Sequence, residues 1–472
     1  MVSFPPEIVD MFLSHLPLSC ASAQNPAREV KSTLQSCSLV CRVWRPLATS
    51  RLFRELKVVF SYSPLSLDAA VAHQHNDSQA DALTSASRGV PSLDDFFKFL
   101  SSHDHVRHYI RRLVLRGFSL YKTERYVQPE LLIAVVNLLP RLVCLELLNI
   151  GVNSPGHKPS VHVWPAVERT LPQLTVKYDR HDRHRKPSDV HNPSDVFRLL
   201  ACFGNVDTLY ISPPTRRSAK LAASGIGLAR HLRTRHLSID TSGIGFKHQR
   251  ALQQFLSGMN TSTSVLEGLR SLSLVNTIHC EILRQPGMIS ALTAVCATLE
   301  VYTATITFQG HIIHPDLSAC TALRSLTLDL LIEKFADGIR ATLDTAAADL
   351  QALGLAHATH PAFRALTLIL RVPSDAFILL EEFDPGYLAR TAACARAGPS
   401  QGCAAVLAAN RLDGALVRLA GACRLAEVRI RLEVRSGVEV GDEAMCAFLG
   451  CVFPGTERTR LAVFEAAAVG IL

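Results

Sequence analysis

The most regular feature of this chain is a short apolar motif that recurs between about residues 110 and 430. Each copy has an apolar residue, two residues of any kind, a second apolar residue, one residue of any kind, and a third apolar residue. The clearest copies are Leu269-Arg270-Ser271-Leu272-Ser273-Leu274 and Leu323-Arg324-Ser325-Leu326-Thr327-Leu328. The others are Ile110, Leu113 and Leu115; Leu142, Leu145 and Leu147; Leu171, Leu174 and Val176; Val206, Leu209 and Ile211; Leu237 with Ile239; Leu299 with Tyr302; Phe363, Leu366 and Leu368; and Leu425, Val428 and Ile430. This alternation places one apolar face of a short strand towards a core.

Most neighbouring copies are about 24 to 40 residues apart, and helical patterns precede many of them. Helices are predicted over 94–100, 130–139, 195–202, 249–256, 288–297 and 336–353. One strand–helix unit cannot bury its apolar face, whereas stacked units can. The pattern therefore predicts an α/β solenoid in which polar residues beside each strand line a concave surface. Beyond residue 385 we expect helices over 387–397, 404–419 and 442–452 and strands over 425–434 and 461–464, as a divergent end with a capping role.

The N-terminal stretch has a different pattern, which predicts three short helices. Pro5 and Pro6 fit a first helical turn, and Pro17 ends that helix. The second helix is predicted from about Glu29 to Trp44, because Pro46 disfavours a helical Arg45 and can itself begin the third helix. A first strand is predicted over 56–60.

This stretch carries more apolar side chains than one small core can hold. Each such side chain contributes about 1.5–3 kcal/mol when it leaves water, and a unit of roughly 50 residues buries too little surface by itself. Some of these side chains are therefore expected to pack on another chain or on the rest of this one. By periodicity alone, the stretch also fits a helical cap on a larger domain.

The amino-acid sequence of this stretch resembles the F-box, in the version common in fungal F-box families. The matching segments are Phe4-Pro5-Pro6-Glu7-Ile8, Leu16-Pro17, Cys37-Ser38-Leu39-Val40-Cys41-Arg42-Val43-Trp44, Pro46-Leu47-Ala48 and Leu52-Phe53-Arg54-Glu55-Leu56. Phe4 stands where the family usually has leucine, and the loop over 18–33 is somewhat long. The resemblance implies that the helices bind the Skp-type adaptor of a cullin ubiquitin ligase. The interface residues that it implies are Phe4, Pro5, Ile8, Leu13, Leu16, Leu39, Val40 and Trp44.

The repeating motif resembles the irregular leucine-rich repeats that follow the F-box in many fungal and animal proteins. An unrelated α/β domain with leucine-rich strands is the alternative. The expected fold class is α/β, with an N-terminal three-helix F-box followed by an irregular leucine-rich-repeat solenoid. The expected domains are the F-box over 1–56, a first strand and polar linker over 57–92, the repeat region over 93–384, and divergent repeats with a cap over 385–472.

Composition restricts the class of protein. The chain has 472 residues, of which 48% are hydrophobic and 19% charged, and this balance is typical of a globular protein. It contains no apolar run of about 18 residues that would predict a membrane span. No export signal is recognised at its start, so the 13 scattered cysteines indicate free thiols in a reducing compartment, the cytoplasm or nucleus.

Motifs for catalysis and cofactor binding are not recognised, so we expect no catalytic residues, no cofactor and no metal site. The glycine pairs within 224–227 and 242–245 are typical of turns rather than of a phosphate loop. His103, His105 and His108 form one histidine cluster, and His181 with His184 lie in a charged stretch over 177–186. That stretch indicates a solvated loop, and the alternatives are a metal site or a contact with an acidic partner or phosphate groups.

Two classes of function follow. The resemblance implies a non-catalytic adaptor that holds the Skp-type adaptor and cullin complex by its helices and an unknown protein target by its repeat surface. The alternative is a repeat scaffold that binds nucleic acid or an acidic partner through its basic residues, consistent with the formal charge of +8. Nucleic acid is less favoured, because Lys and Arg are dispersed and no aromatic stacking motif is present. A catalytic function is the third and least favoured of these possibilities.

Overall fold

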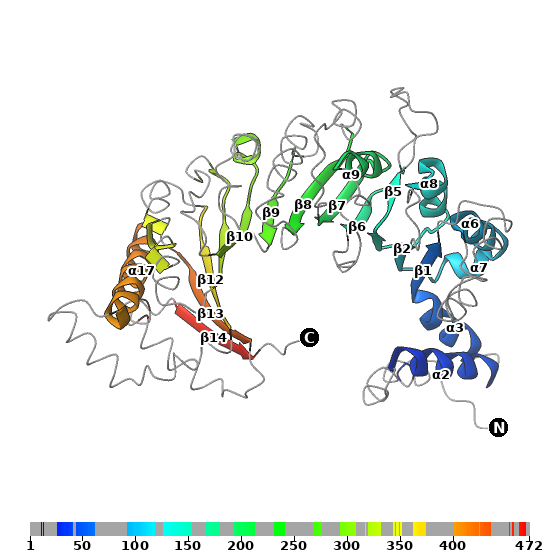
Figure 1. Ribbon diagram of the computed structural model, residues 1–472, viewed down its shortest axis with the longest axis horizontal. Coiled ribbons are helices and arrows are strands. Elements are labelled where there is room, and N and C mark those ends of the chain that lie inside the picture. Colours follow the sequence, from blue (N-terminus) through cyan, green and yellow to red (C-terminus); the bar gives the residue numbers. More distant parts are fainter. Residues whose placement is uncertain are drawn as a thin grey trace, which may run out of the picture. The chain divides into compact units, whose positions relative to one another are not determined.

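The computed structural model describes part of the chain, and the chain divides into two compact units, residues 1–207 and 208–472. The described residues are 11, 13, 26–40, 44–61, 92–118, 126–152, 167, 169–178, 193–212, 231–240, 266, 268–275, 293–307, 317, 320–331, 343–344, 346–348, 350–351, 362–373, 401–423, 425–435, 453, 456 and 462–468. They form an α/β architecture in which the long strands are parallel (Figure 1). This confirms the predicted class, and each unit is described below by itself.

Two helices near the N-terminus precede the first strand. They are α2 (Pro26–Val40) and α3 (Trp44–Arg54). The prediction that Trp44 ends the second helix is wrong, because Trp44 begins α3 and Pro46 lies in its first turn. Proline is tolerated there because the N–H groups of a first turn have no acceptor within the helix.

The sheet of the first unit begins where α3 ends. Its strands are β1 (Glu55–Ser61), β2 (Arg112–Phe118), β4 (Cys144–Leu148) and β6 (Leu171–Lys177), parallel and in this order. The strand predicted over 56–60 is confirmed. Across the sheet, Leu56, Leu113, Leu145 and Leu174 stand in one row. The apolar motif therefore repeats in space without a change of register.

Helices between these strands begin with favourable first turns. They are α6 (Leu93–Ser102), α7 (Asp104–Arg107), α8 (Pro129–Asn137) and α9 (Pro193–Leu200). The Ser92 hydroxyl and the Asp95 carboxylate cap the start of α6 reciprocally, and Pro129 begins α8. The helices predicted over 94–100, 130–139 and 195–202 are confirmed, with ends shifted by about two residues. A short parallel pair joins β3 (Tyr126–Val127) to β5 (Gly151–Val152).

The second unit repeats the same arrangement. The boundary between the units lies within β7 (Asn205–Ile211). The strands that follow it are β8 (Arg233–Asp240), β9 (Ser271–Val275), β10 (Val301–Thr307), β11 (Ser325–Leu331), β12 (Ala365–Pro373), β13 (Glu427–Arg435) and β14 (Ala462–Ala468). They are parallel neighbours in sequence order. Leu237, Leu272, Tyr302, Leu326, Leu366, Val428 and Ala462 share one row.

The apolar motif forms the core of both units, since none of its residues is more than 5% exposed. The two incomplete copies are completed by Thr234, 3% exposed, and Ala304, 1% exposed. Thr234 is accommodated because its hydroxyl donates to the His236 carbonyl at 3.2 Å. The strand register adds one copy that the sequence analysis missed, namely Phe53, Leu56 and Val58.

The C-terminal helix α17 (Gln401–Cys423) confirms and extends the helix predicted over 404–419. Strands β13 and β14 confirm the two strands predicted there. The predicted helices over 249–256, 387–397 and 442–452 lie outside the described residues. Those over 288–297 and 336–353 are described only in part, and the described pieces, such as 293–295 and 346–348, are helical.

Candidate functional site

The N-terminal helices enclose a small core of their own, the helical cluster. Its buried members are Leu13, Leu34, Cys37 and Ala48, and Val30, Trp44, Leu47 and Leu52 pack against them half-buried. Burial raises the pKa of the Cys37 thiol, as expected for a side chain of this core. Four of the described residues are buried in this core, and a helical unit of this size gains stability from further contacts.

Leu39 lies on the outside of this cluster and is 86% exposed. It follows Cys37 by two residues on α2, and two residues turn an α-helix by about 200°, so the two side chains leave opposite sides of the helix. Met11, which is helical, is also outward and 54% exposed. Leu39 and Met11 are therefore large apolar side chains that this cluster does not cover.

The structure separates the predicted interface residues into three groups. Phe4, Pro5, Ile8 and Leu16 lie outside the described residues, and Val40 lies in α2 with its side chain outside them. Leu13 is 1% exposed inside the helical cluster, so its prediction as a contact residue is corrected: its side chain is used by the chain's own core. Trp44 is half-buried against that core. Leu39 is the member of the predicted set that is seen on the outside.

The helical cluster is joined directly to the sheet of its unit. Helix α3 ends at Arg54 and strand β1 begins at Glu55, with no residue between them. The Arg54 carbonyl accepts a hydrogen bond from the Arg111 N–H at 2.9 Å, immediately before β2. This bond continues the β1–β2 ladder into the last residue of the helix.

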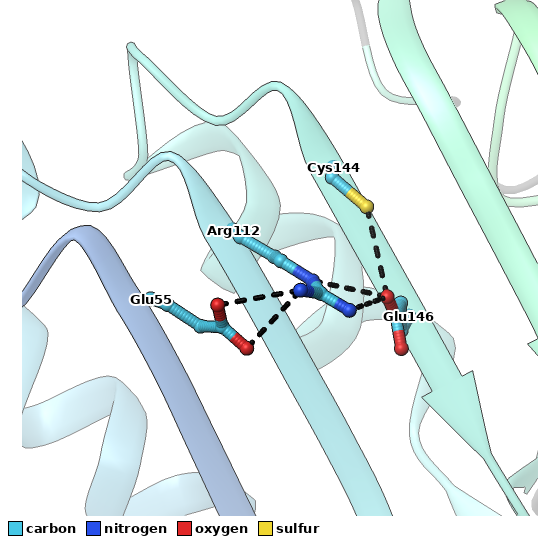
Figure 2. A network of polar contacts seen from close by, with 4 residues as sticks. All are labelled: Glu55, Arg112, Cys144 and Glu146. Atoms are coloured by element: carbon cyan, nitrogen blue, oxygen red, sulfur yellow. Dashed lines mark hydrogen bonds and ion pairs between the residues drawn. The ribbon is translucent and has the colours of Figure 1, made fainter. Parts of the chain in front are cut away.

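Three charged side chains form an ion triad across β1, β2 and β4 (Figure 2). The Arg112 guanidinium lies 2.5 Å from Glu146 Oε1 and 3.2 Å from Glu55 Oε1. The hydrogen bond to Glu146 is the main cause that raises the pKa of Arg112. Because the Arg112 cation lies between two carboxylates, the triad links three strands. It has no uncompensated positive charge that could bind an anionic ligand.

Cys144 borders this triad, with Sγ 4.0 Å from Glu146 Oε1. Burial, and then the charge of Glu146, raise the pKa of the Cys144 thiol. A raised pKa suppresses the thiolate, which is the nucleophilic form of cysteine. The geometry therefore gives Cys144 a structural role.

Hydroxyl side chains occupy one row of the sheet in the second unit. This hydroxyl row consists of Ser238, Ser273, Thr303, Thr327 and Thr367, on consecutive strands from β8 to β12. Each lies between two buried motif residues, so it points to the opposite face of the sheet, and each is half-buried. The row offers a line of hydrogen-bonding groups on the face away from the apolar core.

Acidic and arginine side chains alternate beside the hydroxyl row. Arg371 Nε lies 2.9 Å from Asp329 Oδ1 and 3.3 Å from Glu433 Oε2. The Thr305 hydroxyl also donates to Asp329 at 3.2 Å, and Arg431 pairs with Glu433 at 3.1 Å. These charges compensate one another and tie β10 to β13.

A tyrosine–aspartate hydrogen bond lies at the beginning of the second unit. The Tyr210 hydroxyl donates to Asp240 Oδ2 at 2.5 Å. Burial first, and then this hydrogen bond, raise the pKa of Tyr210 far above its usual value. Tyr210 is therefore a donor at neutral pH and has no character of a general base.

The histidine cluster on and after α6 has a local structural role. The His103 ring stacks on Phe99 with ring centroids 4.5 Å apart, and its Nδ1 lies 2.9 Å from both the Ser102 hydroxyl and the Phe99 carbonyl. Among the described residues, no three His, Cys, Asp or Glu side chains gather as a set of metal ligands. His181, His184 and both glycine pairs lie outside the described residues. None of the described helices combines the length and apolar character that a membrane crossing needs.

One surface feature was missed by the sequence analysis. In six copies of the motif, arginine directly follows the first motif residue, and the strand register brings several of these arginines into a row. They are Arg54, Arg111, Arg235, Arg270, Arg324 and Arg364. The recurrence was readable from the sequence, but it becomes a surface only once the register of the strands is known.

In comparisons with known proteins, the chain matches no protein-family model and no curated protein.

Proposed function

We propose that this chain is the substrate-recognition adaptor of a Skp–cullin–F-box ubiquitin ligase in the cytoplasm or nucleus. In this proposal the N-terminal helices bind the Skp-type adaptor, and the sheet region, taken as irregular leucine-rich repeats, binds a protein target. The observation that carries the proposal is Leu39, which is 86% exposed on a helix whose other face is buried.

Energetics favour a partner on this face. Covering a leucine side chain contributes about 1.5–3 kcal/mol, and Leu39 obtains little of this in the chain alone. A helical unit of roughly 50 residues buries little of its surface by itself, so a protein that binds its outer face also stabilises it. A well-packed partner is thus expected to order the helices as well as bind them.

The direct junction between α3 and β1 supports a tethering role. An adaptor makes no covalent bond; it raises the concentration of a target lysine near the charged ubiquitin-conjugating enzyme. A flexible linker would dilute this effect, whereas here the helix passes into the first strand without a loop.

The decisive test is a charge on the outer face of α2. We expect Leu39→Asp to abolish copurification with a coexpressed Skp-type adaptor, because a carboxylate would enter a desolvated contact. The matched control is Val143→Asp, which puts the same charge on another exposed apolar residue of the same unit, 47% exposed and outside the helices. Retention of the adaptor by the Leu39→Asp protein, with circular dichroism unchanged, would contradict the proposal.

A further inference from the structure

The strands of the second unit carry a row of arginines at their amino-terminal edge, which we call the arginine ridge. It consists of Arg235, Arg270, Arg324 and Arg364, each in the residue directly after the first motif residue of its copy. All four are exposed, and the side chains of Arg270 and Arg324 are 59% and 69% accessible. The ridge lies entirely within residues 208–472.

Backbone hydrogen bonds hold the ridge in a continuous line. The Arg270 N–H donates to the Arg235 carbonyl at 2.8 Å, and the Glu300 N–H donates to the Arg270 carbonyl at 2.8 Å. The Arg324 N–H then donates to the Glu300 carbonyl at 2.8 Å, and the Arg364 N–H to the Arg324 carbonyl at 3.0 Å. Successive positions are therefore about 4.8 Å apart, the distance between neighbouring strands.

Glu300 shows which chemistry the ridge accepts. Its carboxylate lies between two ridge members, 3.7 Å from Arg270 Nη1 and 3.9 Å from Arg324 Nε. It is the sole acidic residue of the row from β8 to β12, in which arginines stand at the other four positions, and one of these, Arg235, already has an interaction of its own. Among the described residues, no acidic side chain forms an ion pair with Arg364.

We propose that the arginine ridge binds an acidic segment of a partner protein, with carboxylates repeated along one side. Residues three or four apart on a helix are about 5–6 Å apart, close to the step of the ridge. Guanidinium groups bind carboxylates with directed, charge-assisted hydrogen bonds. This inference rests on the proposed function in one respect, that the acidic segment belongs to the ligase target.

Nucleic acid fits the ridge less well. The next residues along the strands are His236, Ser271, Val301, Ser325 and Ala365, so His236, at one end of the row, is the single side chain there with a ring for base stacking.

The test uses the purified full-length chain and a fluorescein-labelled peptide of ten glutamates, followed by fluorescence anisotropy at low salt. We expect the double change Arg324→Glu with Arg364→Glu to weaken binding at least about tenfold, because two charge-assisted contacts become repulsive. Arg418→Glu on α17 is the matched control, since Arg418 is exposed in the same unit and outside the ridge. It is expected to bind within about twofold of the unchanged chain, because a single distant surface charge has a small effect.

The substitution Glu300→Gln is expected to change the affinity for the acidic peptide in the opposite direction. Removing the built-in carboxylate leaves Arg270 and Arg324 available, so the peptide is expected to bind several-fold more tightly. No detectable binding by the unchanged chain, equal loss in the control, or no gain from Glu300→Gln would each overturn the proposal. So would tighter binding of a labelled ten-residue oligothymidylate that the ridge change abolishes, because the ridge would then be a nucleic-acid surface.

Failure of this inference is distinguishable from failure of the proposed function. Both ridge variants are expected to copurify with the Skp-type adaptor, and Leu39→Asp is expected to bind the acidic peptide normally. If the unchanged chain captures the adaptor but does not bind the peptide, the ridge proposal fails. If it binds the peptide but does not capture the adaptor, the proposed function of the helices fails.

Discussion

The helical cluster and the repeat sheet use the same kind of side chain with different results. In the sheet the motif residues from Ile110 onwards are at most 5% exposed, whereas in the helices Leu39 is 86% exposed and Trp44, Leu47 and Leu52 are half-buried. An interior strand has a neighbour on each side, and the unchanged register delivers an apolar residue to every row. The described helices pack on one another and α3 runs directly into β1, and Leu39 is not covered by this packing. An outward leucine is therefore informative in the helices, because the leucines of the motif from Leu113 onwards are all buried among the described strands.

The largest expected difference between the two regions is in stability. Phe363→Ala is expected to lower the free energy of unfolding by about 3–5 kcal/mol, because Phe363 is fully buried and its removal leaves a cavity. Leu39→Ala should change it by no more than about 0.5 kcal/mol, as for other surface substitutions. Urea unfolding followed by circular dichroism measures both. Similar losses in the two variants would mean that Leu39 is packed and would remove the basis of the comparison.

A second comparison concerns two arginines that each bridge two acids, one in each unit. Arg371→Met is expected to cost about 1.5–3 kcal/mol, because its partners Asp329 and Glu433 have side chains only 6% and 14% exposed. Arg112→Met should cost less, about 0.5–1.5 kcal/mol, since Arg112 and Glu55 are 45% and 57% exposed, although the side chain of Glu146 is 17% exposed. Methionine retains the aliphatic stem in both cases, so the difference in urea midpoints reports on the charges. Equal costs would show that burial does not separate the two bridges.

The smallest expected effect is a difference in thiol reactivity within the first unit. Cys202 is fully buried, and burial raises its pKa to about 12, whereas Cys37 lies in the helical cluster and is 7% exposed. We expect iodoacetamide to modify Cys37 at least about tenfold faster than Cys202 at pH 8, because the helices open more easily than the sheet. Mass spectrometry of timed samples measures the two rates.

The pKa of Cys202 also predicts the sign of a pH effect. A thiol pKa raised above its ordinary value of 9.0 favours the protonated folded state, so its contribution to stability is complete below about pH 9 and is lost as pH rises towards about 12. Equal modification rates for Cys37 and Cys202 would show that the helices and the sheet open together.

The helical cluster and the sheet also differ in how much of their structure could be predicted from the sequence. The strands were predicted because a period of two in apolar residues is a local property, visible in segments such as 269–274, whereas their parallel order is seen in the structure. The boundary between α2 and α3 was predicted wrongly, since Pro46 was taken to exclude Trp44 from the third helix, although a proline in a first turn costs little. The placement of Leu13 was also wrong, because its exposure depends on which helices pack together.

The sequence by itself determined which side chains of each strand face the core, because alternation along a strand needs no information from other strands. The tertiary structure alone decided which residues stand side by side. Arg270 and Arg324 are 54 positions apart in the chain and yet share one row with Glu300 between them, because strand pairing sets that distance. In the same way, only the packing of the helices decided that Leu13 is enclosed and Leu39 is exposed.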